Sequence, residues 1–256
     1  MILTAENYYS IEASKEYFSA SQIKSFRSCQ ARTLAEIRGE YVRPTTPALL
    51  IGSYVDAYFE GTDSFEAFCR SHPEIFNSRT GNLKSDYVKA NRMIERALLD
   101  EVFMEYASGE TQKIFTGNIF GFPFKAKFDF YQPGVRITDM KTTKSLESVY
   151  VEGEGRLSFA EAYHYPLQMA IYQALEGNNL PCYLDCITKE EEPDIDVFEV
   201  PQEMMDVELK LLEEELPLFD AIKQGIVEPE RCGKCAYCRQ TKKLTGPRSL
   251  YELTEL

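Results

Sequence analysis

Two oppositely charged residues, Asp139 and Lys141, lie two positions apart in the segment VRITDMKTTKS (residues 135–145). The segment has the apolar pattern of a β-strand, in which residues i and i+2 point to one face. A carboxylate and an ammonium there form either a solvent-exposed ion pair or part of a reactive site. A third charged residue, Asp129, precedes them across the turn-forming sequence QPG, and its position decides between these alternatives.

The position of Asp129 depends on the register of the predicted hairpin. A two-residue Pro-Gly turn would pair Asp129 with Thr138 and place the two aspartates on opposite faces. A three-residue loop of residues 132–134, with Gly134 at positive φ, would instead pair Asp129 with Ile137. We predict the second register, because it makes the polar residues of both strands one site. The residues of that face would be Lys127, Asp129, Asp139 and Lys141.

Two close carboxylates of this kind predict a cation site. They repel each other, and the pair is stable mainly when it holds a cation. Hard oxygen ligands suit Mg²⁺ or Mn²⁺. A neighbouring ammonium such as Lys141 would orient a metal-bound water or stabilise charge on a phosphate in the transition state. The residue types therefore fit metal-assisted hydrolysis, with an exposed hairpin face that carries cross-strand ion pairs as the alternative.

A predicted helix follows the two strands and supplies two further polar side chains. The segment SFAEAYHYPLQMAIYQALEGN (158–178) opens with a capping box and ends at Gly177. Pro166 either kinks this helix or marks the first turn of a second one. Gln168 and Tyr172 are four residues apart and share a helix face.

The ordered set Asp129, Asp139-Met140-Lys141 and Gln168-x-x-x-Tyr172 resembles the motifs of PD-(D/E)XK nucleases of the RecB-like branch. Those enzymes place an Asp on one strand, an (Asp/Glu)-x-Lys on the next, and a Gln-x-x-x-Tyr on the following helix. The resemblance implies a mixed α/β (α+β) fold with a restriction-endonuclease-like core, in which a mixed central sheet is flanked by helices.

The same resemblance implies roles for these residues. Asp129, Asp139 and the Met140 carbonyl would hold one or two Mg²⁺ or Mn²⁺ ions, and Lys141 would position the attacking water. Gln168 and Tyr172 would support the substrate or the lysine from the helix.

Two more acidic residues are candidates for the metal by resemblance. Asp56, in GSYVDAYFEG, stands where this branch usually has a metal-ligating His, although a solvated helix face is an equal alternative. Glu110, in SGETQ, stands where related exonucleases carry a supporting acidic residue.

Three longer segments resemble the phage and prophage RecE-like exodeoxyribonucleases: FSASQIKSFRSC, GFPFKAKFD and CGKCAYCRQTKKL. With them the resemblance covers about residues 17–244. It implies an exonuclease that resects linear duplex DNA, 5′ to 3′, and leaves a 3′ single strand for a recombinase or single-strand annealing protein. A ring-like homo-oligomer also follows from the resemblance. The alternatives are a CRISPR-type cluster-bearing nuclease and a non-catalytic DNA-end binding module on the same fold.

Basic residues near the strands are candidates for contacts with DNA phosphates, with a solvated surface as the alternative for at least half of them. The predicted contacts are Lys125, Lys127, Lys144 and Arg136, and Lys24 and Arg27 would extend the path.

Three of the seven cysteines form the motif Cys232-x₂-Cys235-x₂-Cys238, which predicts a metal site rather than disulfides. The spacing is similar to that of ferredoxin-type [4Fe–4S] binders, but thiolates bind Zn²⁺ equally well. In cluster-bearing relatives of the RecB-like branch, one N-terminal Cys joins three C-terminal ones. That resemblance makes Cys29 the fourth ligand and favours iron–sulfur, with Zn²⁺ as the alternative. The remaining residues, Cys69, Cys182 and Cys186, are expected in the core.

The net charge of −13 argues against a non-specific nucleic-acid coat, but not against a DNA enzyme whose basic residues line one channel. No run of 18 apolar residues predicts a membrane span, and the N-terminal sequence lacks the pattern of a signal peptide. We therefore expect a cytoplasmic protein, in the bacterial host if it is phage-encoded.

The elements fit one domain over residues 1–256, with a helical part (1–108), a catalytic sheet and helix (109–200) and a C-terminal part (201–256). Residues 1–18 are expected to be an irregular lead-in and 144–157 a mobile connection. Three antiparallel strands are predicted over 111–143 and two more strands over 181–188 and 195–200. Helices are predicted over 19–39, 48–61, 65–72, 85–107, 158–177 and 202–225, the last bent or broken near Pro217.

Overall fold

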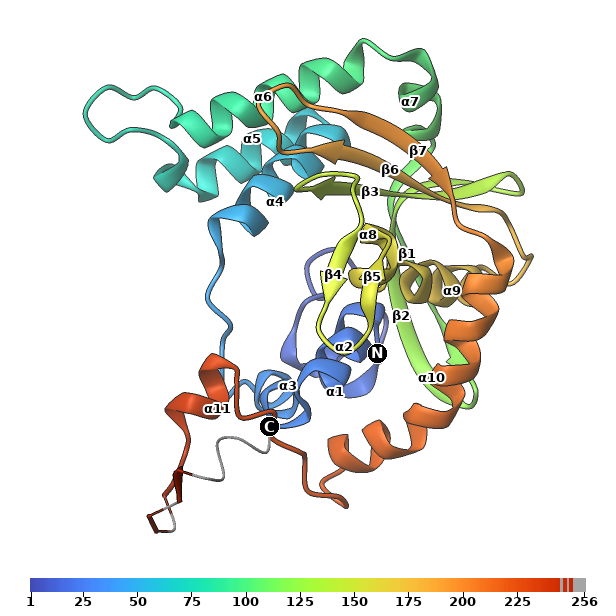
Figure 1. Ribbon diagram of the computed structural model, residues 1–256. Helices are drawn as coiled ribbons and strands as arrows, with labels where there is room; N and C mark the ends of the chain where they lie inside the picture. The colour runs from blue at the N-terminus through green and yellow to red at the C-terminus, as the bar shows by residue number, and fades with distance from the viewer. Residues whose placement is uncertain (245, 248, 251–256) are drawn as a thin grey trace.

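A five-stranded mixed sheet forms the centre of the protein in the computed structural model, which describes residues 1–244, 246–247 and 249–250 (Figure 1). Its strands lie in the order β1-β2-β3-β6-β7. β3 and β6 are parallel, and the other neighbours are antiparallel. The predicted fold class, a mixed sheet flanked by helices, is confirmed. The strands are β1 (Glu110–Ile119), β2 (Phe122–Gln132), β3 (Arg136–Thr143), β6 (Cys182–Thr188) and β7 (Ile195–Glu199).

Helices cover both faces of this sheet (Figure 1). On one face, Met93 and Phe103 pack with Met140 of β3. On the opposite face, Met169 packs with Ile137 of the same strand. The helices are α1 (Ile11–Glu16), α2 (Ala20–Ser28), α3 (Gln30–Arg38), α4 (Pro47–Glu60), α5 (Thr62–Ser71), α6 (Ser85–Leu98), α7 (Glu101–Tyr106), α8 (Phe159–Ala162), α9 (Tyr165–Glu176), α10 (Gln202–Lys223) and α11 (Ala236–Gln240), with a 3₁₀ turn at Pro73–Ile75.

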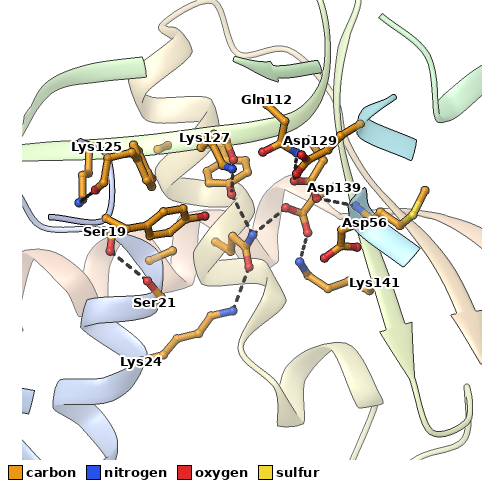
Figure 2. A pocket seen from close by; sticks show the side chains of 18 residues that line it. Ser19, Ser21, Lys24, Asp56, Gln112, Lys125, Lys127, Asp129, Asp139 and Lys141 are labelled. Carbon is orange, nitrogen blue, oxygen red and sulfur yellow. Dashed lines mark hydrogen bonds and ion pairs between the residues drawn. The ribbon is translucent and has the colours of Figure 1, made fainter. Parts of the chain in front are cut away.

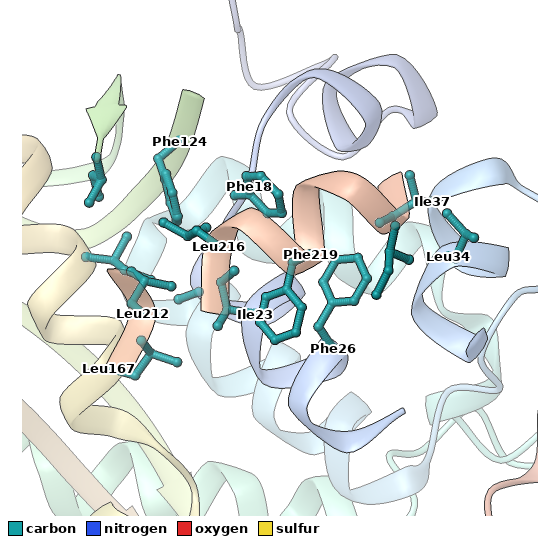
Figure 3. Packing of buried hydrophobic residues seen from close by; sticks show 14 residues of the cluster. Phe18, Ile23, Phe26, Leu34, Ile37, Phe124, Leu167, Leu212, Leu216 and Phe219 are labelled. Atoms are coloured by element: carbon teal, nitrogen blue, oxygen red, sulfur yellow. The ribbon is translucent and has the colours of Figure 1, made fainter. Parts of the chain in front are cut away.

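A separate apolar cluster fixes α2 against α9 and α10 (Figure 3). Phe26 of α2 stacks on Phe219 of α10 with ring centroids 4.9 Å apart. Ile23 and Leu167, from α2 and α9, are both fully buried in the same cluster. Since α2 and α9 both supply polar side chains to the site described below, this packing sets their relative position.

The predicted register of the hairpin between β2 and β3 is wrong. Gln132 pairs with Arg136 and Phe130 with Thr138, so the turn contains residues 133–135. The Val135 N–H donates to the Gln132 carbonyl at 3.0 Å, and Gly134 has a φ of 71°. Proline followed by a glycine at positive φ is the chemistry of a type II turn. The observed register differs by one residue from that of the two-residue turn and by two residues from that of the loop over 132–134.

Two helices predicted as continuous are each broken. The helix expected over 19–39 is interrupted at Cys29, which has extended backbone angles and separates α2 from α3. The helix expected over 85–107 ends at Leu98, and Asp100 starts α7 by accepting the Phe103 N–H at 3.0 Å. By contrast, α10 is one helix that contains Pro217.

Two segments expected to lack regular structure have some. The connection over 144–157 forms a small hairpin of β4 (Val149–Val151) and β5 (Gly155–Leu157). The lead-in contains α1 and then Phe18, which bridges to Phe124 of β2. Of the two alternatives at Pro166, the structure has the second, since this residue lies in the first turn of α9. Among the described residues, no helix has the length and apolarity needed to span a bilayer.

Candidate active site and four-cysteine site

The candidate active site begins where β2 and β3 separate. Their backbone pairing ends at Phe130 and Thr138, and the next residue of β2 is Asp129. One carboxylate oxygen of Asp129 accepts the backbone N–H of Met140 at 3.0 Å. Its other oxygen accepts from the Gln112 side-chain amide at 3.3 Å. The Asp129 side chain thus takes the place of a backbone carbonyl as the partner of the Met140 N–H, at the point where β2 and β3 separate.

Asp139 and Lys141 lie on β3 next to this opening, and they form an ion pair. The Asp139 side chain is 1% exposed, so neither charge of the pair is well solvated. Burial raises the pKa of Asp129 well above its ordinary value, and the charge of Asp139 raises it further. Burial lowers the pKa of Lys141, but the two aspartates outweigh burial and raise it. The lysine therefore stays charged beside two carboxylates that repel each other.

Gln168 of α9 connects this pair to the helical side of the site. Its amide nitrogen donates to Asp139 at 2.7 Å and to the Tyr172 hydroxyl at 3.0 Å. The Tyr172 hydroxyl in turn donates to the Lys127 carbonyl at 3.0 Å. The Gln168 carbonyl oxygen accepts from Lys24 of α2 at 3.1 Å. One glutamine side chain therefore joins α2, α9 and both central strands.

Asp56 reaches the site from α4, on the other side of the sheet opening (Figure 2). Gly52, one turn earlier, allows this approach, because a Cβ there would lie 3.0 Å from Thr142 Oγ1 of β3. The pKa of Asp56 is raised to about 7 by burial, and Asp139 and Glu60 raise it against the opposing effect of Lys141. Three carboxyl groups, those of Asp56, Asp129 and Asp139, thus influence one another electrostatically.

These side chains line a pocket of about 260 Å³, called the central pocket below. Tyr8, Tyr9, Ser19 and Ser21 complete one wall. Its charged residues balance: four lysines (Lys24, Lys125, Lys127 and Lys141) face four acids (Asp56, Glu60, Asp129 and Asp139). A pocket with buried acids on one side and lysines around them can hold both a cation and a phosphate.

Several residues predicted for the site lie elsewhere or have other partners. Glu110 lies outside the central pocket, exposed and paired with Lys113 at 2.6 Å. Arg136 is buried under α7, where it donates to the Glu105 carbonyl and lies 4.4 Å from the Tyr106 ring.

The predicted path of basic residues is also corrected. Lys125 is 4% exposed and donates to the Tyr8 carbonyl, so it is a wall residue rather than an open contact for DNA. Arg27 is paired with Glu208 and Glu215 at 2.7 and 2.9 Å. Lys144 is exposed beyond the end of β3 and does not line the central pocket, whereas Lys127 does.

Gln112 and Lys24 also belong to the pocket, in positions that the sequence analysis did not predict. Gln112 has a φ of 53° inside β1, a conformation for which only glycine would have been a signal. Lys24 was predicted only to extend the path of DNA contacts, but its ammonium group donates to Gln168 and lies 5.0 Å from the Tyr165 ring. Burial and Lys141 lower its pKa to about 7, against the opposing effect of Asp139.

The four predicted cysteines of the second site do come together. Cys29 meets Cys232, Cys235 and Cys238, and all four Sγ atoms lie within 4.8 Å of one another. Backbone N–H groups at the start of α11 point at two of the sulfurs, each at 3.4 Å. Such donors favour the thiolate form that a metal requires. The core prediction for Cys182 and Cys186 is confirmed, while Cys69 is half-buried.

The central sheet and the acidic pocket at its opening define the architecture of the PD-(D/E)XK class. Residues 19–241 match the model of the family described as a PDDEXK-like domain of unknown function (DUF3799). The chain belongs to this family.

One solved structure is similar over the whole chain. It is a protein of Eubacterium rectale named "putative exonuclease", with 39% sequence identity and a TM-score of 0.95 over 99% of this chain and 98% of that one. A phage-related exonuclease of Haemophilus somnus is 14% identical, with a TM-score of 0.34 over 72% of this chain and 96% of its own, a similarity too low to support an argument. No curated protein matches the chain.

Proposed function

We propose that the central pocket is the active site of a metal-dependent nuclease that degrades linear duplex DNA from its ends. The observation that carries this proposal is the convergence of Asp129, Asp139, Lys141 and Gln168 from three elements on one point. A structural ion pair would need only one acid for one lysine. The extra buried acids raise the free energy of the metal-free site unless a cation offsets their repulsion.

The donor set fits a hard divalent ion. Asp129, Asp139 and Asp56 offer carboxylate oxygens, and the backbone carbonyl of Met140, which also lines the pocket, would add a further oxygen. Oxygen ligands of this kind suit Mg²⁺ or Mn²⁺. When bound, such an ion supplies a water of lowered pKa and a positive contact for a phosphate oxygen.

The residues of the chain perform the remaining tasks in this proposal. Lys141, held by Asp139, offsets the charge that develops on the phosphate as water adds to phosphorus. The bond from phosphorus to the leaving sugar oxygen then breaks, and that oxygen takes up a proton. Gln168 keeps Asp139 in one orientation, and Lys24 and Tyr172 keep Gln168 in place. The reaction consumes one water for each phosphodiester bond.

The similarity to the Eubacterium rectale protein, which is named as an exonuclease, supports cleavage from ends rather than internal cleavage. The RecE-like motifs of the sequence support 5′ to 3′ resection, with the 3′ single strand passed to a recombinase or an annealing protein. Lys127 and Lys141 of the central pocket are the groups that would meet the DNA backbone.

The test is degradation of linear duplex DNA labelled at the 5′ or the 3′ end, in Mg²⁺, in Mn²⁺ and in a chelator. The proposal predicts metal-dependent loss of the 5′ label as mononucleotide before the 3′ label is lost, and no cleavage of closed circular duplex. Stable binding of ends without any metal-dependent degradation would overturn the proposal in favour of an end-binding module. Loss of the 3′ label first would overturn the polarity.

A further inference from the structure

We infer that the four cysteines hold a single tetrahedral metal ion of the zinc type, and that a [4Fe–4S] cubane does not fit them. The observation is the closeness of the sulfurs. Sγ of Cys29 lies 3.5 Å from that of Cys238 and 3.8 Å from that of Cys235, and Cys232 lies 3.9 Å from Cys238. The largest separation within the set is no more than 4.8 Å.

These distances match the geometry around one ion. Four thiolates about 2.3 Å from a central Zn²⁺ form a tetrahedron whose edges are about 3.8 Å. In a cubane, each thiolate instead binds a different iron at a different corner of an eight-atom core. The sulfurs of its ligands are therefore kept apart by that core and cannot lie in mutual contact. The sulfur–sulfur distances here therefore fit four ligands around one ion.

The surroundings of the sulfurs suit a closed structural site. Cys29 and Cys238 are each 3% exposed, and Ala31 and Tyr237 pack against them. Arg231 donates to the Cys238 carbonyl at 3.1 Å, and its positive charge offsets part of the net negative charge of a four-thiolate zinc site. No position around the sulfurs is left for a water or a substrate if all four coordinate one ion, because a tetrahedral ion is then saturated.

The site joins the two ends of the chain and supports the central pocket indirectly. Cys29 is the residue at which α2 ends, and its N–H donates to the Ser25 carbonyl at 2.9 Å. The next helix is tied to the C-terminal segment by the Ala31 N–H, which donates to the Glu230 carbonyl at 3.0 Å. Lys24, whose side chain enters the central pocket, lies on the same short α2 helix. A metal at Cys29 thus fixes the end of the helix that presents Lys24.

The inference is independent of the nuclease proposal, and metal analysis tests it without an activity assay. Protein purified without oxygen or chelators, then dialysed against a weak chelator, is assayed for zinc, iron and acid-labile sulfide and by visible absorption. We expect one zinc per chain, no sulfide and no visible band, and we expect replacement by cobalt to give the intense visible bands of a tetrahedral thiolate site. About four irons and four sulfides per chain would overturn the inference. So would the absence of any thiolate-bound metal.

Two matched variants locate the ion. Cys232→Ala removes a half-buried ligand and should lower the zinc content by one ion per chain. Cys69→Ala removes a half-buried thiol on α5, away from the set, and should leave zinc unchanged. Equal zinc content in both variants would overturn the inference. If Cys232→Ala folds poorly, the metal stoichiometry and the cobalt spectrum of the wild-type protein still test it.

Discussion

The Asp129 carboxylate accepts the backbone N–H of Met140 at 3.0 Å, one residue beyond the last backbone pair of β2 and β3. In an unbroken sheet, that N–H would face a carbonyl or solvent. Here the hydrogen bond holds Asp129 beside the strand that carries Asp139 and Lys141. The opening of the sheet and the assembly of the acidic site are therefore one structural feature.

Replacing Asp129 by asparagine should separate metal binding from folding. The amide oxygen of Asp129→Asn can still accept the Met140 N–H, and the repulsion with Asp139 is lost. We expect the melting temperature of the metal-free variant to rise by about 2–4 °C, corresponding to about 1 kcal/mol. The rise in melting temperature that Mn²⁺ gives the wild-type protein should disappear. Thermal unfolding with and without Mn²⁺ measures both effects.

The control for this variant is Asp63→Asn, at an exposed position on α5. It should keep the wild-type response to Mn²⁺. If Asp129→Asn keeps that response too, Asp129 is not a ligand.

Stability of the metal-free protein should fall with rising pH because of Asp56. Its folded-state pKa is about 7, whereas an unfolded aspartate titrates near its ordinary value of about 3.9. Between about pH 4 and about pH 7 the folded state binds more protons than the unfolded state, so the free energy of unfolding decreases through this window and this contribution is constant above it. Asp129, whose pKa is also raised, acts in the same direction.

Urea unfolding at a series of pH values checks this expectation. Asp56→Asn should flatten the slope, and Asp63→Asn should not. Excess Mn²⁺ should also flatten the slope in the wild-type protein, because the metal replaces the protons. A slope that is unchanged in Asp56→Asn would show that Asp56 is not a buried, neutral acid.

The elements of the fold followed from the sequence where a local pattern was strong. The period-two apolar pattern predicted β1, β2 and β3 in the right places, and Gly177 marked the end of α9. No local sequence signal predicted the break between α2 and α3 at Cys29. Good helix formers lie on both sides of it, and the extended backbone there depends on contacts with a segment about 200 residues away.

The face of Asp129 was predicted for a reason that proved incorrect. The predicted register needs a loop of residues 132–134, but the turn contains residues 133–135, and the strands separate immediately after the last pair. Local turn rules gave the positive φ of Gly134 but could not give the separation of the strands, which depends on α4 and α9 packing on opposite faces. For the same reason, Gln112 and Lys24 could not be assigned to the site from the sequence.

Replacing Lys24 by methionine should slow cleavage without loss of stability. Burial and Lys141 lower the pKa of Lys24 to about 7, so the ammonium form is unfavourable in the folded protein near neutral pH. Lys24→Met keeps the apolar stem but no longer holds Gln168. We expect an unchanged or higher free energy of unfolding and at least about a tenfold loss of cleavage rate.

Chemical denaturation and initial rates on linear duplex DNA measure the two properties of Lys24→Met. Lys15→Met, at an exposed position on α1, is the matched control and should change neither. A full cleavage rate in Lys24→Met would remove Lys24 from the account of the active site.

The most direct test of the central claim compares Lys141→Ala with Lys113→Ala, a lysine of the same sheet that is exposed and paired with Glu110. The measurement is the initial rate of mononucleotide release from linear duplex DNA in Mg²⁺ or Mn²⁺, with circular dichroism to establish that both variants are folded. The account predicts that the cleavage rate of Lys141→Ala is about 10²–10³-fold lower than that of the wild-type protein, because the variant lacks the charge that faces the phosphate. Lys113→Ala should match the wild-type protein. A folded Lys141→Ala that cleaves at the wild-type rate would contradict the account.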